Sequence, residues 1–297
     1  MRVAAAAFQS SLCISYQKPT PTHQPTIPLT AKPNSGSSSL HHHPLYTATQ
    51  TNLSSQVKEK VVCLEIMGID SGKALSQNPS LHSASLYSIQ SIIFFLQSKG
   101  ILQKDMPRIV GMCPQILTSN IRTDLLPVFI FLSQDLKVPD HDFRRVIKKC
   151  PRLLISSVND QLRPCLFWLR RLGFWDLRAL AYHDPVLLVS SVENTLIPKL
   201  VYLKSIGFSR DDVLDMVLRC PGLFTFSVEN NLKPKFEYFV EDMKGDLEEL
   251  MEFPQYFSFS LEKRIKPRHM EVVQSGLRVP LPLMLKSTDE EFMDLIR

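Results

Sequence analysis

Apolar positions recur along most of the chain with the period of an amphipathic α-helix, and the same arrangement returns about every 35 residues. Apolar side chains stand three, seven, eleven and eighteen residues after each of five prolines. After Pro151 they are Leu154, Val158, Leu162 and Leu169. Steps of four, four and seven place these side chains on one helical face. The pattern predicts helices that bury this face against a neighbouring unit.

Prolines give the boundaries of the repeat. The first prolines of six units are Pro79, Pro114, Pro151, Pro185, Pro221 and Pro254, which are 35, 37, 34, 36 and 33 residues apart. A second proline follows thirteen residues after each of the last five, as Pro127, Pro164, Pro198, Pro234 and Pro267. The first unit has Ile92 in this place, and terminal repeats are often atypical because one of their faces meets solvent. The spacing predicts about six repeats of 33–37 residues.

Capping signals divide each unit into a short and a longer helix. Ser209 and Asp212 predict a capping box for the short helix that ends at Pro221. Serines in the next turn predict the start of the longer helix, and they are Ser157, Ser191, Ser227 and Ser260. The second proline then lies either near the start of that helix or at a kink within it. Helix pairs that pack mainly on their neighbours form an α-solenoid, so we expect an all-α superhelix without a sheet.

Residues 1–58 differ in composition from the rest of the chain. They contain no Asp or Glu, four basic residues, sixteen Ser or Thr and six Pro. Such a segment has too few apolar side chains to offset the cost of ordering its backbone. An acid-free, hydroxyl-rich start is typical of an organellar transit peptide, and a single Arg favours chloroplast over mitochondrion. We therefore expect a disordered transit peptide over 1–58 and the repeat domain over 59–297.

The double-proline strings resemble those of the mTERF (mitochondrial transcription termination factor) family. The matching strings are PRLLISSVNDQLRP, PVLLVSSVENTLIPK, PGLFTFSVENNLKPK and PQYFSFSLEKRIKPR. The chain departs from the pattern at Ile92, and at Val128 and Cys165, which replace the basic residue after the second proline. The resemblance implies a helical-repeat protein that binds double-stranded DNA or RNA in an organelle and acts on transcription or transcript processing, without catalysis.

Charge is unevenly distributed in the part expected to fold. Residues 59–297 carry 30 basic and 29 acidic residues, but nine basic and two acidic residues lie between positions 144 and 178. Phosphate contacts from Lys and Arg supply most of the affinity for nucleic acid. One predicted helix carries Arg144, Arg145, Lys148 and Lys149 on the face opposite its apolar residues. This cationic face is the first candidate binding site, and a solvated helix exterior is the alternative.

A second group of cations recurs with the repeat, beside the second proline. Lys199, Lys235 and Arg268 follow that proline, Arg163, Lys233 and Lys266 precede it, and Arg264 lies nearby. Cations near a helix start oppose the helix dipole unless an anion is shared with the free backbone N–H groups. Equivalent positions in a solenoid form a row, so these residues are predicted to follow a phosphate backbone. The alternative is a set of exposed lysines on an outer surface.

The segment 237–252 is acidic and could face a basic protein partner. It supports an alternative function for the chain, a protein-binding α-solenoid scaffold in the organelle. Neither function needs a cofactor or a metal, and Cys113, Cys150 and Cys220 lie at repeat-equivalent positions too far apart to share an ion or a disulfide. They are interpreted as small buried apolar residues. No HExxH, GxSxG or GxGxxG motif is present, and no membrane-spanning run, so neither an enzyme nor a membrane protein is expected.

Overall fold

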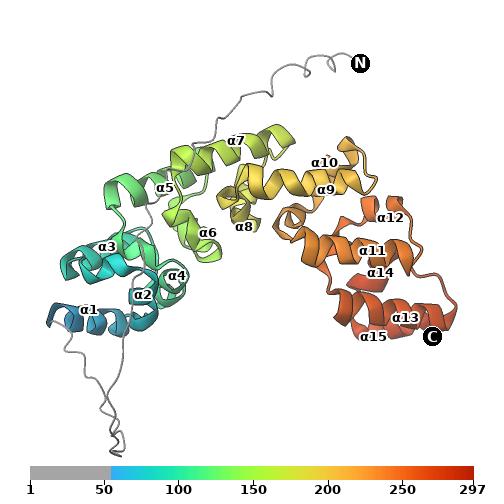
Figure 1. The fold of residues 1–297 in the computed structure, drawn as a ribbon, viewed down its shortest axis with the longest axis horizontal. Coiled ribbons are helices and arrows are strands. Elements are labelled where there is room, and N and C mark those ends of the chain that lie inside the picture. The colour runs from blue at the N-terminus through green and yellow to red at the C-terminus, as the bar shows by residue number, and fades with distance from the viewer. Residues whose placement is uncertain (1–54) are drawn as a thin grey trace, which may run out of the picture. The chain divides into compact units, whose positions relative to one another are not determined.

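The structure is a computed structural model that describes residues 55–297 (Figure 1). The transit peptide expected over 1–58 lies almost entirely outside the described residues. Within residues 55–297 every regular element is a helix and there is no strand. Successive helix pairs lie beside one another in chain order. The expectation of an all-α helical-repeat fold is therefore confirmed.

The α-helices of residues 55–297 are five to thirteen residues long. They are α1 (Ser55–Ile66), α2 (Ser71–Gln77), α3 (Leu86–Ser98), α4 (Met106–Met112), α5 (Leu126–Ile130), α6 (Phe143–Lys149), α7 (Arg163–Leu172), α8 (Leu177–His183), α9 (Ile197–Ser205), α10 (Arg210–Arg219), α11 (Lys233–Glu241), α12 (Leu247–Glu252), α13 (Lys266–Ser275), α14 (Leu281–Lys286) and α15 (Asp289–Ile296). The last two follow the sixth repeat.

Each first proline ends a short helix and begins a 3₁₀ turn. These turns are η1 (Pro79–His82), η3 (Pro114–Thr118), η7 (Pro151–Ile155), η9 (Pro185–Val189), η11 (Pro221–Thr225) and η13 (Pro254–Ser258). Two further 3₁₀ turns, η2 (Gln103–Asp105) and η6 (Asp140–Asp142), lead into short helices. Proline suits the first position of such a turn because its missing N–H has no partner there. The turns of consecutive repeats contact each other in an unbroken series from η1 to η13. They therefore form the spine along which the repeats stack.

In each of the last five repeats, a π-helical turn precedes the second proline. These turns are η4 (Ile121–Leu125), η8 (Val158–Leu162), η10 (Val192–Leu196), η12 (Val228–Leu232) and η14 (Leu261–Ile265), and another, η5 (Phe131–Asp135), follows α5. In the third repeat the Leu162 N–H donates to the Ser157 carbonyl, five residues back, at 3.0 Å. Proline then occupies the second position of the α-helix that follows. A wide turn moves the preceding carbonyls away from the pyrrolidine ring, which would clash in a regular helix. The proline thus lies near a helix start, and the helix begins with a π-turn.

The first repeat provides an internal comparison. Ile92 replaces its second proline, and α3 runs through this position as a continuous α-helix without a π-turn. Ile92 is itself buried. The π-turn before the second-proline position is therefore associated with the proline itself, because the repeat that lacks this proline also lacks the turn.

The predicted caps are present. The side-chain hydroxyls of Ser157, Ser191, Ser227 and Ser260 accept from the backbone N–H three residues on. Ser209 and Asp212 form the reciprocal capping box at the start of α10. Gly173 ends α7 in the left-handed region, at φ 115°. A residue with a Cβ is strained there, which explains the glycine.

The repeated apolar stripe forms the core. Leu154, Leu162 and Leu169 are at most 1% exposed, and Leu188, Leu196 and Leu203 are fully buried. The cysteines that precede repeat prolines are buried too, and burial raises the pKa of the Cys113, Cys150 and Cys220 thiols. Five cysteines among the described residues are free thiols. The interpretation of these cysteines as buried apolar residues is confirmed.

Candidate nucleic-acid interface

The three cations that follow the second proline lie inside the protein. Lys199, Lys235 and Arg268 are 9%, 5% and 5% exposed. The Lys235 Nζ donates to the Phe257 carbonyl in the 3₁₀ turn of the next repeat, at 2.6 Å. In the third repeat Cys165 occupies the same position, and its Sγ lies 3.1 Å from the Leu187 carbonyl in the next turn. The position therefore joins a long helix to the following turn.

Arg268 makes the equivalent connection at the end of the array. Its Nη1 donates to the Met284 carbonyl at 2.6 Å, and its Nη2 pairs with Asp289 at 2.5 Å. Lys199 instead donates to the Thr195 carbonyl of its own helix, at 2.9 Å. Carbonyl oxygens of the protein thus take the place that we predicted for a phosphate. That these three residues bind a phosphate backbone stays a prediction. Their burial does not support it, because each residue is at most 9% exposed.

The four cations around the second proline that are less buried have acidic or carbonyl partners. Arg163 pairs with Asp135 at 3.3 Å, Lys233 with Glu229 at 4.0 Å, and Lys266 with Glu262 at 2.6 Å. Arg264 donates to the Leu285 carbonyl at 2.8 Å and, like Arg268, to the Ser287 carbonyl. Exposed pairs of this kind are weak, about 0–1 kcal/mol, so a phosphate could displace the carboxylates. Arg264 and Arg268 thus share the Ser287 carbonyl and Asp289 as partners.

We predict a pH-dependent contribution of Lys235 to stability. Burial lowers the pKa of Lys235 to about 8, whereas an unfolded lysine has a pKa of about 10.4. Between these values the unfolded chain binds more protons, so the free energy of unfolding rises with pH. Relative to Lys235→Met, the wild type should gain about 1.5 kcal/mol between pH 8 and pH 9.5 in denaturant titrations. The exposed Lys233→Met is the matched control and should show no gain. A flat difference for Lys235→Met would contradict the prediction.

Helix α6 divides its four cations into two pairs. The predicted apolar face, Phe143, Val146, Ile147 and Cys150, is buried, as expected. Arg144 and Lys148 contact Asp105, which is 4% exposed, at 2.5 Å and 3.1 Å. The Arg144 guanidinium holds the pKa of that carboxyl below its usual value, with help from Lys148. These two cations therefore join α6 to the start of α4.

Arg145 and Lys149 are exposed on the other side of α6. The Arg145 guanidinium lies 4.6 Å from the centre of the Tyr182 ring, and the Lys149 Nζ donates to the Tyr182 carbonyl at 3.2 Å. Tyr182 belongs to α8, and its hydroxyl donates to Asp142 at 2.6 Å. The first predicted site is thus half structural: Arg144 and Lys148 are paired with Asp105, whereas Arg145 and Lys149 pair with no carboxylate among residues 55–297.

Arg145 is one member of a row of exposed cations on the short helices, which we call the short-helix row. Its members are Lys73 on α2, Arg108 on α4, Arg145 on α6 and Arg178 on α8. Among residues 55–297 none of the four forms an ion pair. Each helix contacts the next, α2 with α4, α4 with α6 and α6 with α8. The four charges therefore follow one another from repeat to repeat.

The spacing of the row suits a polyanion. Packed helices lie about 8–10 Å apart, and duplex DNA rises about 3.4 Å per base step. One repeat thus corresponds to about three steps. Arg108 donates from Nε to the Lys148 carbonyl at 3.3 Å, and Arg178 from Nε to the Tyr182 hydroxyl at 3.2 Å. These bonds hold the side chains at the surface and leave other N–H groups of each guanidinium for a phosphate.

Lys73, Arg108 and Arg178 are not among the binding residues predicted from the sequence. The signal was present, because Lys73, Arg108 and Arg145 all stand six residues before the first proline of their repeat, and Arg178 stands seven before. In the next two repeats the same place is taken by Asp215 and Glu248. The short-helix row therefore ends at α8, and the sign of the charge changes beyond it.

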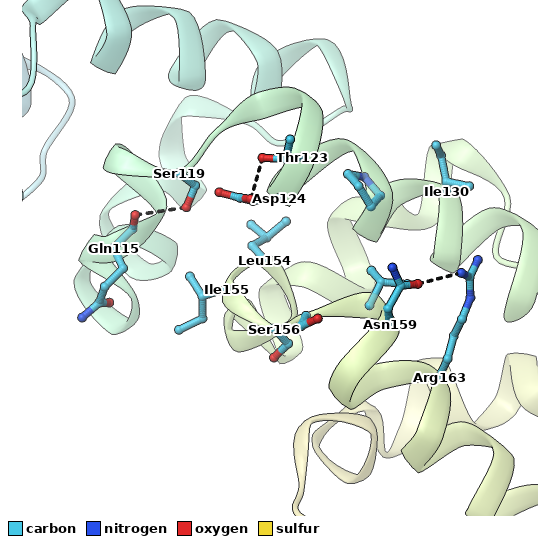
Figure 2. Close-up of a pocket in the computed structure, with 13 residues that line it drawn as sticks. Gln115, Ser119, Thr123, Asp124, Ile130, Leu154, Ile155, Ser156, Asn159 and Arg163 are labelled. Carbon is cyan, nitrogen blue, oxygen red and sulfur yellow. Dashed lines mark hydrogen bonds between the residues drawn. The ribbon is translucent and has the colours of Figure 1, made fainter.

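A groove of about 590 Å³ lies between the second and third repeats (Figure 2). Hydroxyl and amide side chains line it together with Asp124, Arg163 and apolar residues such as Ile130 and Ile155. Figure 2 shows Arg163 directed at the Asn159 amide oxygen, 3.0 Å away, and Thr123 bonded to Asp124 at 2.7 Å. Its polar groups are thus largely paired with each other. We do not assign a ligand to this groove.

In residues 55–297 no cluster of three or more His, Cys, Asp or Glu side chains is arranged to hold a metal ion. No helix in the same part of the chain is both long enough and apolar enough to cross a membrane. The histidines at 41, 42 and 43 lie outside the described residues.

Paired helices, proline-defined turns and a cationic row define an α-helical repeat protein. A family model for mTERF matches the chain over residues 30–177 and again over residues 176–293. The chain therefore belongs to the mTERF family, as the double-proline strings indicated.

Three curated relatives are plant proteins named "Transcription termination factor MTERF4, chloroplastic". The protein of Arabidopsis thaliana is 31% identical over 85 residues, which is 29% of this chain and 16% of the relative. Those of Zea mays and Oryza sativa subsp. japonica are each 33% identical over 85 residues, or 29% of this chain and 17% and 16% of the relatives. The match thus spans about a sixth of their length.

Proposed function

We propose that this protein binds nucleic acid in the chloroplast and regulates plastid gene expression without catalysing a reaction. The ligand is double-stranded DNA or RNA, and the action is regulation or termination of transcription, or transcript processing. Membership of the mTERF family supports this class of function. The names of the three plant relatives support the chloroplast and transcription. The composition of residues 1–58 supports import, with 59–297 as the repeat domain.

The short-helix row is the observation that carries the proposal. Lys73, Arg108, Arg145 and Arg178 are exposed, lack a carboxylate partner within residues 55–297, and are spaced by one repeat each. Lys149 adds a fifth charge beside Arg145. A polyanion would contact them in sequence and release counterions from its phosphates. Such contacts position the ligand without reading its sequence.

The salt dependence of binding tests the proposal. With five phosphates neutralised by the short-helix row and Lys149, the logarithm of the association constant should fall with the logarithm of salt concentration with a slope of about −4.5. The measurement is fluorescence anisotropy of the full chain with a labelled duplex DNA and a labelled RNA of equal length between 50 mM and 200 mM salt. A slope near zero for both ligands would contradict nucleic-acid binding by this row.

A protein-binding scaffold is the second candidate. The reversal of charge after α8 favours it, because Glu248 and Glu252 are exposed where earlier repeats carry cations, whereas Asp215 is paired with Arg219 at 2.7 Å. Both glutamates belong to the mainly acidic segment 237–252, which a basic protein would complement. The salt titration separates the candidates, since a scaffold without nucleic-acid affinity gives no binding to either labelled ligand.

A further inference from the structure

A groove of about 390 Å³ lies between α8 and α10, at the end of the short-helix row. Its walls are mostly apolar, formed by Phe174, Trp175, Leu218 and Pro221, and its titratable residues are Asp176, His183 and Asp184. The Trp175 side chain is 74% exposed. At Gly173, in the left-handed region, a Cβ would lie 3.0 Å from Leu218 Cδ1. The glycine thus lets Leu218 close one side of the groove.

Asp184 is unusual for its place in the repeat. The residue before the first proline is buried in every other repeat, as Asn78, Cys113, Cys150, Cys220 and Phe253. Asn78 satisfies its amide by donating to the Pro114 carbonyl at 3.0 Å and to Thr118 at 2.9 Å. By contrast, no hydrogen bond or ion pair within residues 55–297 reaches the half-buried Asp184 carboxylate. Its fellow carboxylate, Asp176, is already occupied in capping α8 through the Ala179 N–H, at 2.8 Å.

An unpaired carboxylate in an apolar wall costs stability. Burial raises the pKa of Asp184, while the nearby Lys149 and His183 act in the opposite direction. A ligand that offsets this cost must bring a positive charge and donors. It must also tolerate the apolar walls and the open face of an indole.

We propose that the groove at Trp175 and Asp184 binds an arginine side chain presented by a partner protein. A guanidinium stacks on the face of an indole and offers two parallel N–H groups to one carboxylate. Exposed tryptophan is also a frequent anchor of protein interfaces. A phosphodiester would bring negative charge toward Asp184, so the charge of the groove favours a basic protein over nucleic acid. This inference is independent of the short-helix row.

N-acetyl-L-arginine amide is the probe, and N-acetyl-L-citrulline amide is its uncharged counterpart. The readout is the indole N–H signal of Trp175 in NMR spectra of the full chain, assigned with Trp175→Phe because Trp168 is the second tryptophan. We expect a saturable shift with the arginine probe and binding at least tenfold weaker with the citrulline probe. Asp184→Asn should lower the affinity for arginine by at least tenfold. Asp211→Asn, on the exposed first turn of α10, is the matched control and should leave the affinity unchanged.

Stability and a second ligand complete the test. Asp184→Cys installs the residue of three other repeats and should raise the thermal midpoint, because burial of the carboxylate outweighs its attraction to Lys149 and His183. Trp175→Ala should abolish arginine binding, as measured by calorimetry, and should not lower the thermal midpoint. Equal affinity for the citrulline and arginine probes would overturn the proposal, and so would an unchanged affinity for arginine in Asp184→Asn. It would also be overturned if a single-stranded oligonucleotide shifted the Trp175 indole N–H signal at a lower concentration than the arginine probe.

Discussion

Replacing the four cations of the short-helix row by glutamine should lower the affinity for nucleic acid on the order of 100-fold to 1000-fold near physiological salt. The variant is Lys73→Gln, Arg108→Gln, Arg145→Gln and Arg178→Gln. Each lost phosphate contact removes the entropy of released counterions and reduces the salt slope by about one. Because Lys149 is unchanged in this variant, the slope should decrease in magnitude to about −1. Anisotropy titrations at several salt concentrations measure both quantities.

A control variant with the same change in net charge makes this test specific. Lys204, Arg210, Lys263 and Arg278 are exposed and lie outside the row. Replacing these four by glutamine should change the affinity by less than tenfold, because only long-range attraction is reduced. Equal losses in the two variants would show that net charge, and not the row, governs binding. Circular dichroism confirms that both variants keep their helices.

The buried cations give a further comparison for the same assay. If Lys199, Lys235 and Arg268 contact a phosphate backbone, as the repeat pattern predicted, then Lys235→Met lowers affinity. If the Lys235 Nζ serves only the Phe257 carbonyl, the substitution changes stability and leaves the salt slope intact. We favour the second outcome because a buried ammonium cannot reach a ligand without opening the contact between two repeats.

Asp105→Asn should lower the free energy of unfolding by about 3 kcal/mol at neutral pH. The substitution keeps the shape of the side chain but leaves Arg144 and Lys148 without their carboxylate. Breaking a buried ion pair costs about 3–5 kcal/mol, and the lower end applies because the two cations are 33% and 40% exposed. Denaturant titration of the full chain measures the loss.

The pH dependence of this loss has a definite sign. The Arg144 hydrogen bond lowers the pKa of Asp105 in the folded protein. The contribution of ionised Asp105 to the free energy of unfolding is therefore complete above the unfolded pKa of about 3.9. This contribution is lost as the pH falls below that value. The difference between wild type and Asp105→Asn should shrink in acid. The control is Asp135→Asn, which breaks the exposed pair with Arg163 and should cost less than about 1 kcal/mol. Equal losses for the two substitutions would refute the structural role of Asp105.

The short-helix row could have been read from the sequence, whereas the buried ion pair could not. Lys73, Arg108 and Arg145 share one distance to a repeat proline, and repetition alone places them on neighbouring helices. Asp105 lies 39 residues before Arg144, and nothing in that spacing marks it as a partner. A run of four cations on α6 looked uniform because charge type does not reveal which side chains have carboxylates beneath them.

The sequence by itself determined the helical repeat, its proline boundaries, its serine caps and its buried stripe. These features depend on residues close together in the sequence or on a regular spacing between repeats. They can therefore be predicted without knowing which side chains are brought together by folding. Tertiary structure alone decided that Lys235 points into the next repeat and Arg268 toward α14 and α15, while Arg145 and Arg178 face solvent. All four are cations on helices, and only the carbonyls, carboxylates and rings that packing brings beside each one decide where its charge is used.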